Sequence, residues 1–144
     1  MLDAVIEVAA AFIGTLAFGF LFNIRGKKLW LAALGGLLSW LLFLLFGLFL
    51  PHEAARYLLV SILISVYSEV MARLLKTPAT AFCMISLIPL IPGGSLYYTM
   101  TDALQGSTGE FVTRASATLE LAAALALGIL LVTACARKLP EIRS

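Results

Sequence analysis

Long apolar runs are the feature of this sequence that most restricts its fold. Residues 29–50 carry no charged side chain, and neither do residues 77–101. Only 12% of the whole chain is charged, whereas a soluble domain keeps about a quarter of its residues charged because its surface faces water. Lipid needs no such polar cover. The sequence therefore predicts an all-α integral membrane protein.

Five stretches meet or approach the about 20 residues that a helix needs to cross the hydrocarbon core. The predicted transmembrane helices occupy about residues 5–22, 29–50, 57–72, 77–88 plus 95–105, and 115–136. They form a single transmembrane domain over residues 1–144. The start of the chain carries Asp3 and Glu7 where a secretory signal would be basic, so we expect the first helix to be retained.

The positions of lysine and arginine predict the orientation, since basic loops stay cytoplasmic. With five crossings, the first loop, the third loop and the C-terminus share one side, which holds eight cations against Arg56 and Arg114 on the other. The eight are Arg25, Lys27, Lys28, Arg73, Lys76, Arg137, Lys138 and Arg143. We expect the N-terminus outside and the C-terminus in the cytoplasm, in the inner (plasma) membrane of a bacterial cell.

Small residues at helical spacing indicate where helices touch, because in lipid close backbone approach must supply the attraction. The sequence contains three such series. They are Ala32, Gly35, Gly36 and Ser39; Ser61, Ser65, Ser68 and Ala72; and Ser116, Glu120, Ala124 and Gly128. We interpret them as buried seams, either within the chain or against another subunit.

The segment Pro89-x-x-Pro92-Gly93-Gly94 interrupts the fourth apolar run. Proline inside a helix removes a backbone hydrogen bond and clashes with the preceding turn, so we expect the fourth helix to unwind between about Pro89 and Gly94. Each half would cover roughly 16–18 Å at helical rise, which predicts a break near the bilayer midplane. Broken helices at that depth are typical of transporters. A re-entrant pair of half-helices is the alternative.

The half-helix after the break predicts a site for a small solute that bears a carboxylate. Ser95 is a favoured N-cap residue, and the free N–H groups and positive dipole end of a helix suit an anion. A kink without ligand is the alternative. The candidate substrate-binding residues are Pro89, Pro92, Gly93, Gly94, Ser95, Tyr97, Tyr98 and Thr99.

Ionisable residues inside membrane spans are costly to bury and usually have a function. Asp102 and Glu120 lie towards the outer face and are candidates for proton coupling, with interfacial water as the alternative environment. Glu69 is a third coupling candidate, but it precedes Arg73 by four residues, and this spacing favours an intrahelical ion pair. Asn23 is a polar candidate at the end of the first helix.

The sequence carries no signature of an enzyme, a cofactor site or a metal site. His52 has no ligand partners nearby, and Cys83 and Cys135 lie singly in apolar runs, which indicates packing. The basic residues flank the predicted helices without the aromatic interleaving of a nucleic-acid surface. We therefore predict no cofactor and no nucleic-acid partner.

Several motifs together resemble a known family. They are Phe18-Gly19-Phe20-Leu21-Phe22-Asn23-Ile24, the helix opening Leu29-Trp30-Leu31-Ala32-Ala33-Leu34-Gly35-Gly36, and Pro89-x-x-Pro92-Gly93 followed by Tyr97 or Tyr98 and Met100. Over residues 18–100 the sequence resembles the smaller membrane half of the threonine/serine exporter (ThrE) family. The resemblance implies a secondary exporter of small amino acids or of small dicarboxylates such as succinate. It also implies a second membrane half as partner.

Two functions follow as hypotheses. The first is a subunit of a secondary exporter, which alternates access around the broken helix and pairs with a second half of inverted topology or forms a homo-oligomer. The second is an accessory subunit that transports nothing and stabilises or regulates a partner. An ion channel is disfavoured, since no ring of charge and no filter-like repeat is present.

Overall fold

The computed structural model describes residues 2–106 and 108–138, so that Arg143, counted above for the orientation, lies outside the described residues. The described residues contain helices and no strand, which confirms the all-α class. The elements are α1 (Leu2–Leu21), α2 (Lys27–Gly47), α3 (Glu53–Leu74), α4 (Ala79–Leu87), the 3-10 turn η1 (Ile88–Leu90), α5 (Gly93–Leu104) and α6 (Thr108–Lys138).

Four helices, α1, α2, α3 and α6, are each long and apolar enough to cross a membrane. The segment Ala79–Leu90 and α5 pass the same test only as a pair, and the chain bends by 61° between them. The prediction of several membrane-spanning helices is therefore confirmed. A fifth span exists if the bent pair counts as one crossing, and a re-entrant pair is the other arrangement that this bend allows.

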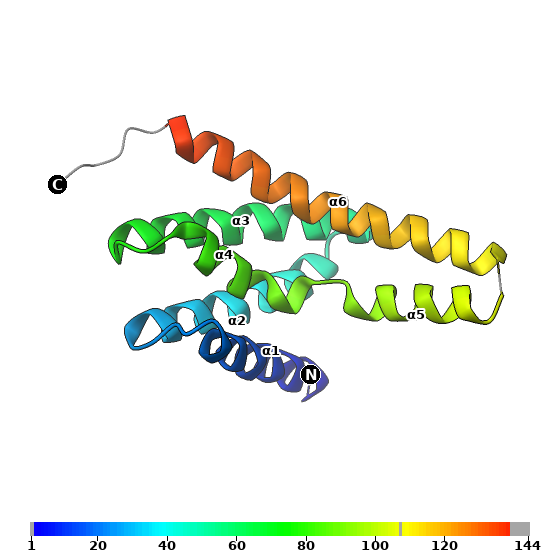
Figure 1. Cartoon of the computed structure of the whole chain (residues 1–144), viewed down its shortest axis with the longest axis horizontal. Helices are drawn as coiled ribbons and strands as arrows, with labels where there is room; N and C mark the ends of the chain where they lie inside the picture. Colours follow the sequence, from blue (N-terminus) through cyan, green and yellow to red (C-terminus); the bar gives the residue numbers. More distant parts are fainter. Residues whose placement is uncertain (1, 107, 139–144) are drawn as a thin grey trace.

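The core of the molecule is a bundle in which α2, α3 and α4 pack against one another, with α1 beside α2 and α6 beside α3 (Figure 1). The α1–α2 turn, the α3–α4 turn and the end of α6 all lie at the same end of this bundle (Figure 1). The basic residues of these three segments therefore gather at one end. We call this the basic end of the bundle.

Asn23 terminates α1. Its φ of 57° is in the left-handed region that glycine and asparagine adopt most readily. The N–H of Asn23 donates to the carbonyl of Phe20, and the N–H of Ile24 donates to the carbonyl of Gly19, both at 3.0 Å. This pair of bonds is a Schellman motif, which satisfies carbonyls left open at the helix end. Helix termination thus accounts for an asparagine at this position.

Glycines let the helices of the bundle approach closely. A Cβ added at Gly36 would collide with Thr15 of α1, and one at Gly35 would collide with Ser86 of α4. A Cβ at Gly128 of α6 would collide with Ser61 Oγ of α3 and lie 3.0 Å from the carbonyl oxygen of Leu58. These contacts lie within the chain, as one of the two interpretations of the small-residue series expected.

The first two small-residue series are buried throughout, and the third is buried only in part. Ala124 and Gly128 face α3, but Ser116 and Glu120 are exposed. Within the chain the third series therefore forms a seam only from Ala124 to Gly128. The reason is that α6 extends past the start of α3, so its first turns have no helix of the bundle to pack against. A seam of Ser116 and Glu120 against another subunit stays a prediction.

Helix α6 has 31 residues and is about 46 Å long at helical rise, and it starts seven residues before the predicted span at 115–136. Glu120 shares a small cleft with Ala54 in the first turn of α3, so residues 108–119 lie beyond the start of that helix. Helix α5 packs along this extension and projects with it from the bundle (Figure 1). We call α5 and residues 108–119 the α5–α6 hairpin.

The break between α4 and α5 lies off-centre in the bundle. Cys83 Sγ of α4 lies 3.6 Å from Ser65 Oγ of the antiparallel α3. Ile91 lies eight residues after Cys83, so on the antiparallel α3 it is level with about the residue eight before Ser65, which is Tyr57. Tyr57 is four residues, or about 6 Å, from the start of α3. The break therefore lies nearer the start of α3 than its middle, and the predicted depth near the bilayer midplane stays a prediction. The prolines determine where along the chain the break occurs, but helix packing determines where it lies along the length of the bundle.

Gly128→Val is predicted to destabilise the fold, because its larger side chain collides with Ser61 and with the backbone of Leu58. Overpacking of this kind costs about 1–3 kcal/mol. Thermal unfolding of the detergent-solubilised chain measures the loss. The matched control is Gly14→Val in α1, where an added Cβ meets nothing within 4 Å. Equal stability of the two variants would contradict the α3–α6 contact.

Candidate functional site

The helix break is shorter than the sequence predicts. Pro89 lies in the 3-10 turn η1, and Gly93 and Gly94 already belong to α5. Only Ile91 and Pro92 depart from helical geometry, with ψ angles of 123° and 57°. The expected unwinding from Pro89 to Gly94 is therefore wrong in extent. A proline near the start of a helix costs no hydrogen bond there, so both prolines sit at helix starts and not in an unwound loop.

The first turn of α5 has no side-chain cap, and the prediction that Ser95 caps it is wrong. Pro92 is the N-cap residue, and its carbonyl accepts the N–H of Leu96 at 3.0 Å. The N–H groups of Gly94 and Ser95 have no acceptor among the described residues. A Cβ at Gly93 or Gly94 would meet nothing within 4 Å. The positive end of this helix therefore borders open space.

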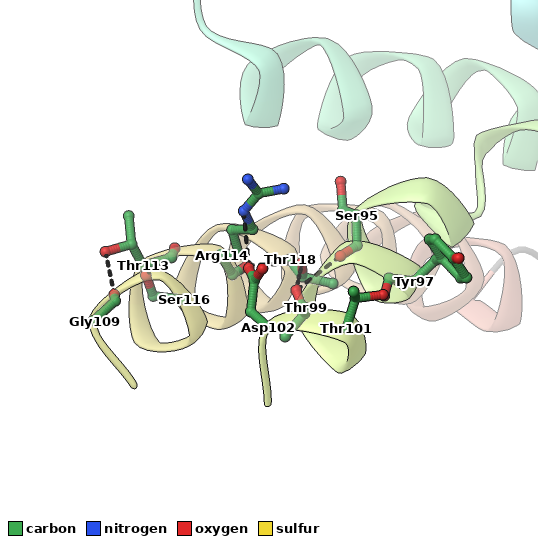
Figure 2. A network of polar contacts seen from close by, with 10 residues as sticks. All are labelled: Ser95, Tyr97, Thr99, Thr101, Asp102, Gly109, Thr113, Arg114, Ser116 and Thr118. Carbon is green, nitrogen blue, oxygen red and sulfur yellow. Dashed lines mark hydrogen bonds and ion pairs between the residues drawn. The ribbon is translucent and has the colours of Figure 1, made fainter. Parts of the chain in front are cut away.

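A polar seam joins α5 to α6 (Figure 2). Thr99 Oγ1 lies 3.2 Å from Thr118 Oγ1 and donates to the carbonyl of Ser95 at 2.7 Å. Thr118 Oγ1 in turn donates to the carbonyl of Arg114 at 2.8 Å. Each hydroxyl has a single proton, so at any moment only two of these three contacts can be hydrogen bonds donated by the two threonines. The Ser95 hydroxyl points away from this seam (Figure 2).

Asp102 and Arg114 extend the seam with an ion pair. Arg114 Nε lies 3.0 Å from Asp102 Oδ2, and the Arg114 guanidinium lies 5.5 Å from the centre of the Tyr98 ring. Asp102 is only 7% exposed, and its Oδ2 lacks an aligned hydrogen bond among the described residues, so the contact is electrostatic in character. The sequence analysis missed Arg114 as a partner. The turn between the two helices contains Gly106, whose φ of 74° is in the left-handed region that favours glycine. A glycine at this position is the sequence feature that could have indicated the turn.

The remaining candidates are dispersed over the molecule. Tyr97 and Tyr98 are exposed on α5, their rings 5.5 Å apart edge to face. Glu120 is exposed on α6. The predicted ion pair of Glu69 with Arg73 is present at 3.3 Å, near the basic end. The structure thus gathers Ser95, Thr99 and Asp102 on one helix, and leaves Glu69 and Asn23 far along the chain from it.

No group of three or more His, Cys, Asp and Glu residues that could hold a metal ion occurs in residues 2–106 and 108–138. The site consists of open backbone N–H groups beside a helix break, aromatic hydroxyls and an ion pair whose carboxylate is buried. Such a set can bind and orient a small charged solute by hydrogen bonds and electrostatics.

Comparison with known families decides the assignment. Residues 7–135, nearly the whole chain, match the family model described as Threonine/Serine exporter, ThrE. The chain belongs to the threonine/serine exporter (ThrE) family. No curated protein and no solved structure matches it.

Membership of the ThrE family places the chain among transporters and not in a class of enzymes. Together with its apolar helices, membership identifies a multi-pass membrane protein of an exporter family. The ThrE match extends past residue 100 and covers α5 and most of α6. The helix break and the α5–α6 hairpin are therefore both part of the family unit.

A double-mutant cycle of Asp102→Asn and Arg114→Gln tests the ion pair. We expect a coupling energy of about 1 kcal/mol, because the carboxylate is buried but the guanidinium is 48% exposed. Equilibrium unfolding in mixed micelles provides the four free energies. The control cycle pairs Arg114→Gln with Glu110→Gln, an exposed acid one turn away on α6. A coupling energy indistinguishable from zero would show that Asp102 and Arg114 do not interact, and the control cycle gives the size of an exposed pair within one helix.

Proposed function

We propose that this chain is one half of a secondary exporter for threonine and serine or for small dicarboxylates, coupled to protons and paired with a second membrane half in a bacterial inner membrane. The ThrE match over residues 7–135 is the observation that carries this proposal. The helix break supports it, because broken helices form the solute sites of many secondary transporters.

The substrate carboxylate binds at the start of α5 in this proposal. The N–H groups of Gly94 and Ser95 lack acceptors among the described residues, and open space surrounds both glycines. A helix N-terminus attracts an anion through these N–H groups and the helix dipole. Pro89 and Pro92 set the bend that exposes this turn. The exposed hydroxyls of Tyr97 and Tyr98 are the further ligands, whereas Thr99 is occupied by the seam to α6.

Asp102 is the preferred coupling residue among the three candidates. Its carboxylate is buried beside one cation, so protonation would remove the attraction between α5 and α6 at that point. Glu120 is exposed, and Glu69 pairs with Arg73 within its own helix. A proton on Asp102 would therefore free α5 to move relative to α6, which is the kind of coupling that alternating access requires.

The second membrane half would cover α5. This helix has its main contacts with α6 alone, and its other face exposes large apolar side chains. These are Leu96, Tyr97, Met100 and Leu104. A partner seated against this face would also close the open space beside Gly93 and Gly94, and the substrate site would then lie between the two halves.

Reconstitution of the chain alone and together with its partner half tests the proposal. Proteoliposomes are assayed for labelled threonine, serine and succinate, with and without a pH gradient. We expect flux only when both halves are present and an increase with the gradient. Transport by the partner half alone at the full rate would instead assign this chain the accessory role. Which solute is carried decides between amino acids and dicarboxylates.

Gly94→Leu tests the proposed substrate site. The side chain enters open space, so we expect the variant to fold, and it blocks the N–H groups of the first turn, so we expect flux to fall at least tenfold. Gly109→Leu is the matched control, because Gly109 is also exposed near a helix start and has nothing within 4 Å of an added Cβ. Unchanged flux in a folded Gly94→Leu protein would exclude a site at the break.

A further inference from the structure

A groove opens between α3 and α6 in the half of the bundle that ends at the basic end. Its volume is about 440 Å³. Apart from Glu69 and Arg73 its lining is almost wholly apolar, and several of these side chains are exposed at its surface. The apolar lining residues are Ile62, Val66, Val70, Leu131, Val132, Cys135 and Ala136.

The groove follows from side-chain size along two parallel helices. At the end of the groove away from the basic end, the contact of Gly128 with Ser61 brings the two helices together. At the basic end, a hydrogen bond of 3.1 Å from Arg73 Nη2 to the carbonyl of Ala136 joins them. Between these contacts short side chains, three valines, Cys135 and Ala136, line most of the space and leave it unfilled. The groove is therefore bounded at both ends and open at its side.

The length of the groove corresponds to one leaflet of a bilayer. From Ile62 to Arg73 the helix rises about 16 Å. Half of a hydrocarbon core of about 30 Å is about 15 Å. An acyl chain that starts at the interface beside Arg73 would thus end near Ile62. A helix of about 10 Å diameter would fill roughly 1,200 Å³ over this length, far more than the groove offers.

The polar end of the groove is cationic. Arg73 makes both of its contacts, to Glu69 and to Ala136, through Nη2, so its Nε and Nη1 donors have no partner in the described part of the chain. Lys76 follows three residues later, and Arg137 and Lys138 end α6 directly after the groove-lining Ala136. Within a few residues of this end of the groove, the described chain therefore carries four cations and the carboxylate of Glu69. A phosphate suits this arrangement, since free guanidinium N–H groups make charge-assisted hydrogen bonds to phosphate oxygens.

We propose that this groove is a binding site for one anionic phospholipid, with an acyl chain along α3 and α6 and the headgroup phosphate at Arg73. The matching length, the apolar lining and the surplus of positive charge at one end all point to this occupant. Basic pockets between helices bind lipid headgroups in this way. The site is separate from the helix break, and the proposal stands whether or not the chain exports a solute.

Native mass spectrometry of the delipidated full chain in detergent tests the proposal, with phosphatidylglycerol and phosphatidylcholine as probes. We expect one phosphatidylglycerol to bind per chain. Its binding should be half-saturated at a lipid concentration about tenfold lower than the one phosphatidylcholine requires. Val66→Trp fills the groove and should abolish retention. Leu63→Trp is the matched control, because Leu63 is 44% exposed and Val66 is 46% exposed on the same helix, but only Val66 lines the groove. Thermal unfolding verifies that both variants fold.

The contribution of charge is tested separately. The double variant Lys76→Gln/Lys138→Gln should reduce the preference for phosphatidylglycerol severalfold. The double variant Lys27→Gln/Lys28→Gln removes the same charge from the start of α2 at the same end of the bundle, and should leave the preference unchanged. Equal retention of both lipids by the wild type, equal loss in the Val66 and Leu63 variants, or a dimer that Val66→Trp dissolves would each overturn the proposal.

Discussion

The bundle depends on the close approach of helix backbones at a few small residues. Water does not drive helices together inside lipid, so packing contacts must supply the attraction. Gly36 meets Thr15, Gly35 meets Ser86, and Gly128 meets Ser61, which joins α1 to α2, α2 to α4 and α3 to α6. The hydroxyls at these contacts cost little to bury, because Thr15 and Ser61 donate to carbonyls of their own helices and Ser86 donates across to Ala32.

Helix α5 does not depend on close backbone approach at small residues, and the proposed function rests on this difference. Its glycines, Gly93 and Gly94, face open space and hold no neighbouring helix. Its attachment to α6 is polar, through Thr99, Thr118 and the Asp102–Arg114 pair. A helix held by a few polar contacts and a bend of 61° can change its position at a lower cost than one locked by close packing. The helix with this polar attachment is thus also the helix that carries the proposed solute site.

Much of the site could be predicted from sequence, because proline and glycine act on the backbone locally. The two prolines located the break, and the predicted end of the second half-helix at residue 105 lies one residue past the end of α5. The N-cap of α5 was predicted wrongly. Serine is a favoured N-cap residue, but the helix already begins at Gly93, so that Pro92 and not Ser95 is the N-cap. The partner of Asp102 was missed for a different reason. A contact across a turn depends on how two helices fold back, and spacing along the chain does not reveal it.

The sequence alone determined the helical membrane class, the family and the position of the break along the chain. Each of these is encoded locally, in runs of apolar residues, in motifs and in the backbone chemistry of proline. Only the tertiary structure decided that the break lies off-centre, that α6 runs past the bundle to form a hairpin with α5, and that a lipid-length groove lies between α3 and α6. These features depend on the register between helices, which is set by contacts such as Gly128 with Ser61 between residues far apart in sequence.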